Sequence, residues 1–455
     1  MSAAGTPLAP APSAVTGADL YRLIADLYPI CRSITGEGVR ETLRRIERQL
    51  PLSIREVPSG TRVFDWTVPR EWNIRDAWIK NRDGERVVDF RKSNLHVMSY
   101  STPVRATMPL AELQAHLHRL PDRPGWIPYK TSYYSENWGF CVTDDQYRSL
   151  TEPEYDVCID STLADGSLTY GEWYLPGERE DECLLSCHVC HPSLCNDNLS
   201  GIALAVYLGR WLASLPARRL SYRLLFIPGT IGAITWLALN QKTFGAIRHG
   251  LVLTGVGGPG PLVYKRSRRG NALIDRAAAH VLEHAGTGNE IREFIPYGYD
   301  ERQYCSPGIN LPVGRLSRTP YQEYPEYHTS ADNLDLVTED RLEQAYRACQ
   351  SILNVLEHDG AYVNTNPMCE PQLGRRGLYR SLGGAGESPA SEMAMLWVLN
   401  QADGAHTLLE IAERSGLTFE SIRAAAALLM EHGLLRQSAD GPASGEPMED
   451  RRGNG

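Results

Sequence analysis

The chain has 455 residues, of which 42% are hydrophobic and 22% charged, the composition of a globular protein long enough for two or three domains. Its net charge of −9 argues against a general affinity for nucleic acid. No apolar run approaches the roughly 20 residues that span a bilayer. The Ala- and Pro-rich start lacks the features of a signal peptide, and the ten cysteines are scattered. We predict a cytoplasmic protein with a disordered tail over residues 1–16.

The first part of the chain combines two helices with a β-rich stretch. Residues 19–50 have helical periodicity, interrupted by a Gly-containing loop at 29–38. We interpret that loop as a helix connection; the alternative is that Arg32 or Glu37 lies near an active site. Residues 60–170 consist of short β segments with many aromatic residues, which predicts an inserted β module. Its aromatic side chains are expected to form its core, or else to cover one side of a cleft.

From residue 183 the pattern changes to alternating strands and helices. Apolar strands are predicted at 183–187, 222–227, 250–254 and 291–295. Helices are predicted at 198–215, with Asn198 as a candidate cap, and at 231–240, 272–285 and 342–356. This alternation favours an α/β domain with a central, mostly parallel sheet flanked by helices. We assign residues 17–365 to this domain, including the inserted module.

The C-terminal part has the pattern of a winged helix-turn-helix module, which we place at residues 366–436. Three short helices are predicted at 391–399, 408–415 and 419–432. The third carries only Arg423 as a basic residue, so a protein–protein or dimerisation role is favoured over DNA binding. Homo-oligomerisation stays open, and residues 437–455 are expected to be a disordered tail.

One loop concentrates side chains that bind metals. The apolar strand at 183–187 ends abruptly, and His188, Cys190, His191 and Asp197 follow. Imidazole and carboxylate groups at the carboxyl end of a strand are typical of a metal site in an α/β protein. Two later stretches, 297–307 and 323–333, also fall where strands meet loops. Between them they supply further candidate residues: Asp300, Glu301, Arg302, Tyr304, Glu323, Glu326, His328 and Asp332.

The order of these residues resembles that of the zinc aminopeptidase superfamily, which includes the glutaminyl cyclases. The shared order is a His, then Asn-Asp-Asn-Leu-Ser-Gly, then Tyr-Asp-Glu, then His-Thr-x-x-Asp. Over residues 20–435 the chain more closely resembles a bacterial aminopeptidase-like family that has an inserted β domain and a C-terminal winged helix. The matching stretches are Pro-Ile-Cys-Arg-Ser-Ile-Thr-Gly, Cys-His-Pro-Ser-Leu, Asp-Glu-Arg-Gln-Tyr-Cys-Ser-Pro-Gly and Glu-Tyr-His-Thr-Ser-Ala-Asp-Asn.

The resemblance implies a zinc site of one or two ions. His188 and Asp300 would hold one ion, Asp197 would bridge, and His328 would bind on the other side. Asp332 would orient His328 from the second shell, where Cys190 and His191 are also expected. A zinc-bound water would be the nucleophile, and a carboxylate would take its proton. The expected substrate-binding residues are Arg302 and Tyr304, and the expected substrate is a small molecule or peptide-like.

The chain departs from the family at the residue that should supply this carboxylate. The family has Pro-Glu-Thr-Ile-Gly where this chain has Pro-Gly-Thr-Ile-Gly, so Gly229 can neither bind a metal nor accept a proton. Glu301 and Glu326 are our candidate replacement bases, with Glu323 nearby in sequence. Three interpretations follow: a zinc amidohydrolase, a glutaminyl-cyclase-like enzyme that rearranges an acyl or amide group without hydrolysis, or a catalytically silent metal-binding scaffold. The basic run 265–269 is interpreted as a solvated turn, with an anion site as the alternative.

Overall fold

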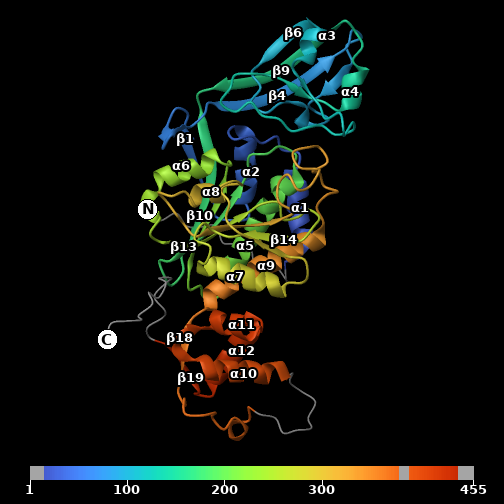
Figure 1. Cartoon of the computed structure of the whole chain (residues 1–455). Coiled ribbons are helices and arrows are strands. Elements are labelled where there is room, and N and C mark those ends of the chain that lie inside the picture. The colour runs from blue at the N-terminus through green and yellow to red at the C-terminus, as the bar shows by residue number, and fades with distance from the viewer. Residues whose placement is uncertain (1–14, 379–388, 439–455) are drawn as a thin grey trace, which may run out of the picture. The chain divides into compact units, whose positions relative to one another are not determined.

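The computed structural model describes residues 15–378 and 389–438 (Figure 1). The predicted tails at 1–16 and 437–455 lie outside the described residues, except for their inner ends. The chain divides into two compact units, one made of residues up to 270 plus 290–347, the other of 271–289 plus the residues from 348 onward. Residues 271–289 therefore group with the C-terminal unit, whereas our domain boundaries placed them in the α/β domain. In the described part of the chain no helix is long and apolar enough to cross a membrane.

The first unit is built on an eight-stranded sheet with the order β1-β10-β12-β11-β13-β16-β14-β15. The strands are β1 (Ser53–Pro58), β10 (Ser167–Leu175), β11 (Glu182–His188), β12 (Ser221–Ile227), β13 (Ile247–Leu253), β14 (Leu262–Lys265), β15 (Glu290–Arg292) and β16 (Val313–Arg318). The four central strands, β12, β11, β13 and β16, are parallel. β1 and β10 pair antiparallel with their neighbours, and β14 pairs antiparallel with β16 but parallel with β15. The predicted α/β fold is therefore confirmed, with a mixed sheet around a parallel centre.

Helices cover both faces of this sheet, as the alternation along β10 shows. Successive strand residues point to opposite faces. Gly171 lies against Leu43 of α2 (Glu37–Glu47), whereas its neighbour Glu172 accepts a hydrogen bond from Trp236 of α6 (Ile231–Leu239). α5 (Gly201–Ser214) packs on β11, β12 and β13, and α1 (Gly17–Leu27) packs on α5. Every residue of β11 is buried, as expected for a strand between two helical layers.

The β-rich stretch forms a separate four-stranded antiparallel sheet, β5-β4-β9-β6. Its strands are β4 (Glu71–Lys80), β5 (Arg86–Asp89), β6 (Val104–Pro109) and β9 (Glu154–Ala164). Smaller elements beside it are β2 (Arg62–Val63), β3 (Trp66–Thr67), β7 (Leu117–His118), β8 (Phe140–Cys141), α3 (Leu110–Gln114) and α4 (Asp144–Ser149). Buried aromatic residues such as Trp72, Phe140 and Tyr155 form its core, as predicted.

The second unit has the winged-helix pattern. Its helices are α7 (Leu273–His284), the part of α9 (Glu339–His358) from residue 348, α10 (Pro389–Gln401), α11 (Leu408–Ser415) and α12 (Phe419–Glu431). A small sheet, β18-β17-β19, completes it with strands Asp403–Thr407, Ala361–Asn364 and Leu435–Gln437. Gly416 ends α11 with φ +69, a left-handed conformation that glycine adopts without steric cost. On α12, Arg423 pairs with Glu420, so its charge is already neutralised locally.

Candidate metal centre

His188 and Asp197 meet at the carboxyl edge of the parallel strands. His188 is the last residue of β11 and pairs with Ile227 at the end of β12. The loop that follows returns Asp197 to this edge. It is held there by Asn198, whose amide donates to the carbonyl of Leu253 (3.1 Å) and accepts from the backbone N–H of Gly255 (3.1 Å). Asn198 therefore joins the loop to β13 instead of capping α5, our prediction for it.

Three imidazoles converge on the Asp197 carboxylate. Asp197 Oδ1 lies 2.8 Å from His188 Nε2, and Oδ2 lies 3.1 Å from His328 Nε2 and 3.8 Å from His191 Nε2. The ligand atoms of His188, His191 and Asp197 all lie within 4.8 Å of one another. Burial opposes ionisation of Asp197, but the neighbouring imidazoles outweigh it and hold its pKa well below the usual range. His191, expected only in the second shell, is thus placed to bind a metal directly.

Asp300 adds a second buried carboxylate next to this cluster. It immediately precedes the short helix α8 (Glu301–Tyr304) and is 1% exposed. Among the described residues neither of its carboxylate oxygens has a hydrogen-bond partner, and burial raises its pKa to about 7. A Cβ at Gly229 would lie 3.1 Å from His188 Cβ and 3.4 Å from Asp300 Oδ1. A side chain at position 229 would therefore contact both His188 and Asp300. A buried, unpartnered carboxylate beside imidazoles fits a bound cation, which would compensate its charge.

Asp332 supports the centre by a different contact from the one we predicted. Its carboxylate accepts hydrogen bonds from the backbone N–H groups of Asn196 (2.6 Å) and Asp197 (3.0 Å). It therefore fixes the loop that carries Asp197 and does not contact His328 directly. The His328 ring instead stacks on Tyr327, with centroids 3.9 Å apart. Its backbone carbonyl accepts from the Tyr129 N–H (2.7 Å), so a residue of the β-rich stretch lies at the site.

The candidate bases lie in three different surroundings. Glu301 is fully buried and paired with Lys265 at 2.6 Å, with Arg315 at 3.6 Å. Lys265 is therefore not part of a solvated turn. Glu323 forms an exposed ion pair with Arg292 (2.5 Å). Within the described chain Glu326 keeps one buried carboxylate oxygen without a hydrogen-bond partner.

A cavity of about 400 Å³ opens onto the imidazoles. Its lining consists of His188, His191, Gly229, Thr230, Tyr297, Gly298, Tyr299, Asp300, Arg302, Tyr321, Gln322, Tyr327 and His328. Of the two predicted substrate-binding residues, Arg302 lines the cavity. Tyr304 does not, because it is buried with its hydroxyl 3.0 Å from that of Ser186.

The tyrosines of the cavity are candidate functional residues that our sequence analysis missed. Tyr299 stacks on His188, with centroids 5.2 Å apart and an interplanar angle of 15°, as Tyr327 stacks on His328. The rings therefore help to orient two candidate ligands. The signal for them was the local composition, since each of the stretches 297–304 and 321–328 contains three tyrosines.

Arg32 holds the metal-binding loop from behind. Its buried guanidinium donates from Nε to the His191 carbonyl (2.8 Å), from Nη2 to the Pro192 carbonyl (3.1 Å) and from Nη1 to the Leu27 carbonyl (2.8 Å). Glu37 is exposed and pairs with Arg44. Our alternative interpretation of the 29–38 loop was that Arg32 or Glu37 lies near the site. The structure places Arg32 there, as a clamp on the backbone of the metal-binding loop.

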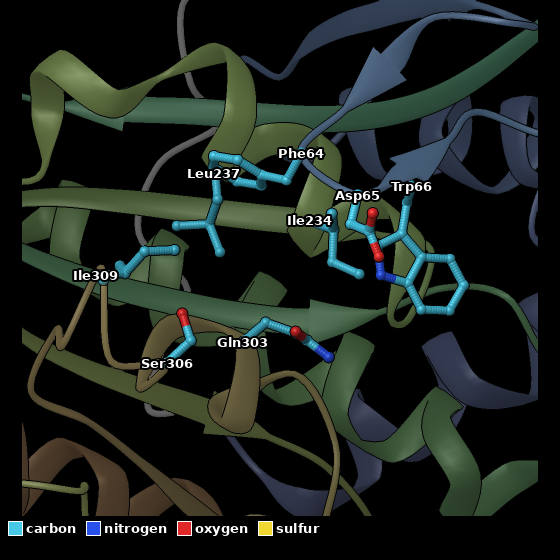
Figure 2. Close-up of a pocket in the computed structure, with 9 residues that line it drawn as sticks. Phe64, Asp65, Trp66, Ile234, Leu237, Gln303, Ser306 and Ile309 are labelled. Carbon is cyan, nitrogen blue, oxygen red and sulfur yellow. The ribbon is translucent and has the colours of Figure 1, made fainter.

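A second cavity, of about 330 Å³, includes Gln303 of α8 in its lining (Figure 2). Its walls are mostly apolar side chains from the β2–β3 turn, α6 and the segment after α8: Phe64, Trp66, Ile234, Leu237 and Ile309. The polar groups on its lining are those of Asp65, Gln303 and Ser306. This lining contains one carboxylate and neither imidazole nor thiol, so it lacks the donor set of a zinc site.

Comparison with known proteins supports the fold and the two-part organisation. The model of a family described as a domain of unknown function (DUF4910) matches residues 21–359, and a winged helix-turn-helix model matches 360–437. A Clostridium acetobutylicum protein is 51% identical over 424 residues, covering 93% of this chain and 97% of its own length. It is named as a candidate polysaccharide biosynthesis protein with an aminopeptidase-like domain.

Solved structures are similar to this chain as well, and two of them illustrate the range. A crystal structure of a candidate peptidase from C. acetobutylicum superposes with a TM-score of 0.88 at 50% identity, covering 92% of this chain and 96% of that one. A zinc aminopeptidase from Bacillus subtilis has a TM-score of 0.54 at 12% identity, covering 75% and 95%. The second similarity concerns the fold alone. Together these matches confirm the aminopeptidase-like architecture and the C-terminal winged helix.

Proposed function

This chain belongs to the family of the domain of unknown function DUF4910, and we propose that it is a zinc-dependent amidohydrolase acting on a small amino-acyl or peptide-like substrate. The observation that carries the proposal is the convergence of three imidazoles on Asp197, beside the unpartnered carboxylate of Asp300. Such a set of nitrogen and oxygen donors suits zinc. The aminopeptidase-like domain named in the 51% identical relative is consistent with it.

In this proposal His188, Asp197, His328 and Asp300 hold the metal, and His191 offers a further imidazole. A bound zinc ion would act as a Lewis acid and supply a water-derived nucleophile at neutral pH. The protein orients these ligands through groups behind them. Arg32 fixes the backbone at His191, and Asp332 fixes the backbone at Asp197. Tyr299 and Tyr327 hold two of the imidazole rings by stacking.

Of the two predicted bases Glu326 is our preferred proton acceptor, although it is not among the residues that line the cavity. Glu301 is neutralised by Lys265, so accepting a proton would break a buried ion pair. Glu326 Oε2 has no such partner in the described chain and belongs to the same loop as His328. Glu326→Gln should then reduce kcat while leaving bound zinc unchanged. Glu301→Gln should chiefly lower stability.

Gly229 favours a second candidate function, in which the chain binds metal without hydrolysing amides. A side chain at this position would lie between His188 and Asp300, and glycine leaves that place without a carboxylate. Such a protein would either rearrange an acyl or amide group, as a glutaminyl cyclase does, or serve as a scaffold. For the winged helix we propose a protein–protein role, because the charge of Arg423 on α12 is neutralised by Glu420.

The test combines metal content with turnover. Purified protein is assayed for bound zinc by elemental analysis and for hydrolysis of a panel of aminoacyl and N-acyl amides. His188→Ala should lose both zinc and turnover, whereas His432→Ala, which changes an exposed histidine on the winged helix, should lose neither. Zinc without turnover of any panel member would favour the second candidate. Absence of zinc from the unmodified protein at micromolar metal would refute both zinc functions.

A further inference from the structure

We propose that the substrate of the metal-site cavity is an amide that carries a carboxylate group, and that Arg302 binds this carboxylate. The inference rests on the proposed function, because it names a substrate class for the same cavity. A carboxylate bound at Arg302 would also distinguish this cavity from one that binds a substrate through a free amino group. Three features of the cavity support this assignment: an available guanidinium, the balance of charge on the cavity wall, and the turn that positions Arg302 relative to Asp300.

Arg302 is the guanidinium on this wall that the protein leaves available. Its Nε is buried and has no hydrogen-bond partner, and within the described ranges no carboxylate pairs with it. The guanidinium carbon lies over the Tyr297 ring, 5.7 Å from its centroid. The neighbouring cations differ, since Lys265 pairs with Glu301 and Arg292 pairs with Glu323. A half-buried guanidinium with unused donors favours a bidentate anionic ligand.

The charge on the wall disfavours a substrate amine. A carboxylate beside the reacting amide is the acceptor that binds an ammonium group most strongly, through a charge-assisted hydrogen bond. Asp300 is the one carboxylate among the residues that line the cavity, and it lies next to His188, on the metal side. Gly229 supplies no second carboxylate. With a divalent cation compensating Asp197 and Asp300, Arg302 leaves the wall positive, which is complementary to an anion.

The turn that carries Arg302 also fixes its distance from the metal ligands. Arg302 lies two residues after Asp300, in α8. Between them Glu301 anchors the turn to Lys265, which also donates to the carbonyls of Ile295 (3.1 Å) and Tyr297 (2.9 Å). A rigid turn of this kind presents the two side chains to one cavity in a fixed relation.

A substrate that matches these features of the cavity is an N-acyl amino acid. Its scissile amide would lie at the imidazoles, its carboxylate at Arg302, and a flat or apolar group against Tyr297 and Tyr321. Hydrolysis adds one water across the C–N bond. The carbonyl carbon gains the hydroxyl and becomes a carboxylic acid, and the nitrogen leaves as an amine with the second hydrogen.

The experiment measures binding as well as turnover, so it does not depend on hydrolysis. Zinc-loaded protein is titrated calorimetrically with N-acetyl-phenylalanine, N-acetyl-leucine and N-acetyl-glutamine, and with the corresponding neutral N-acetyl amino-acid amides. We expect the carboxylates to bind roughly ten- to hundredfold more tightly, the range for a hydrogen bond to a charged group. Arg302→Gln should abolish this preference, Arg302→Lys should keep part of it, and Arg75→Gln, which breaks only an exposed ion pair with Asp160, should keep all of it.

Each result bears on one proposal at a time. In turnover assays the Arg302→Gln change should raise KM more than it lowers kcat, because the guanidinium binds the substrate and does not react. Equal affinity for acids and amides would overturn the inference even in an active hydrolase. So would a preference that survives Arg302→Gln, since the metal alone would then explain it, or failure of every carboxylate to bind at millimolar concentration. Selective binding without turnover would support the inference while contradicting the proposed hydrolysis.

Discussion

Replacing Gly229 by glutamate tests how the metal centre tolerates a restored carboxylate. The backbone at Gly229 is not in the left-handed region, so a side chain does not require a change of conformation. The new Cβ would lie 3.1 Å from His188 Cβ, close enough that the imidazole must move by a few tenths of an ångström. This crowding should cost about 1 kcal/mol. Gly229→Gln has the same shape without the charge, so it isolates the steric part.

The charge adds a second cost in the metal-free protein. The glutamate carboxylate would lie beside Asp300, whose own carboxyl is buried and lacks a partner in the described chain. Two unit charges ~5 Å apart at an effective dielectric constant of ~20 repel by about 3 kcal/mol. Because burial raises the pKa of Asp300 to about 7, its carboxyl carries a full charge only at alkaline pH. We therefore expect metal-free Gly229→Glu to be about 3 kcal/mol less stable than Gly229→Gln at alkaline pH, and less destabilised than that at neutral pH. Zinc should remove that difference, because the cation compensates both carboxylates.

Urea unfolding of both variants, with chelator and with saturating zinc, measures these quantities. The Glu variant should also bind zinc more tightly than the Gln variant in competition with a chromophoric chelator. Equal unfolding midpoints for the two variants in both conditions would refute the reasoning, since residue 229 would then not face the metal ligands. Hydrolysis that appears only in Gly229→Glu would show that the natural chain lacks a working base.

Further predictions concern the groups that support the centre. Arg32→Met removes the hydrogen bonds of a buried guanidinium to three backbone carbonyls and should lower the free energy of unfolding by about 4 kcal/mol in a urea titration. Lys265→Met leaves buried Glu301 with only the more distant Arg315 as a cation and should cost up to roughly 3–5 kcal/mol. Adding Glu301→Leu should restore part of that stability, and an equally unstable double variant would contradict the pairing. His191→Ala should weaken zinc binding by roughly ten- to hundredfold, measured with a competing chelator, and an unchanged affinity would exclude His191 as a ligand.

The sequence predicted the order of elements well because periodicity and turn residues are local. The strand at 183–187 and the helix at 231–240 agree with β11 and α6 to within one residue at each end. β14 and β16 were missed, since Leu262–Lys265 is short and Val313–Arg318 includes two arginines that the fold buries. The antiparallel pairing of β10 with β12 could not be predicted from local sequence patterns either, because strand pairing joins segments that are far apart in the chain.

For the site, the sequence by itself determined the donor chemistry: an imidazole and a carboxylate nine residues apart after a buried strand, with two later loops to match. It also showed what is missing at Gly229. Only the tertiary structure decided which carboxylates are available, because that depends on partners distant in sequence. Asp300 and Glu301 are adjacent and chemically alike, yet Lys265 and Arg315 neutralise Glu301, while Asp300 has no hydrogen-bond partner among the residues that the structure describes. The fold likewise brought His191 and the tyrosines to the ligands, since three loops meet at one edge of the sheet.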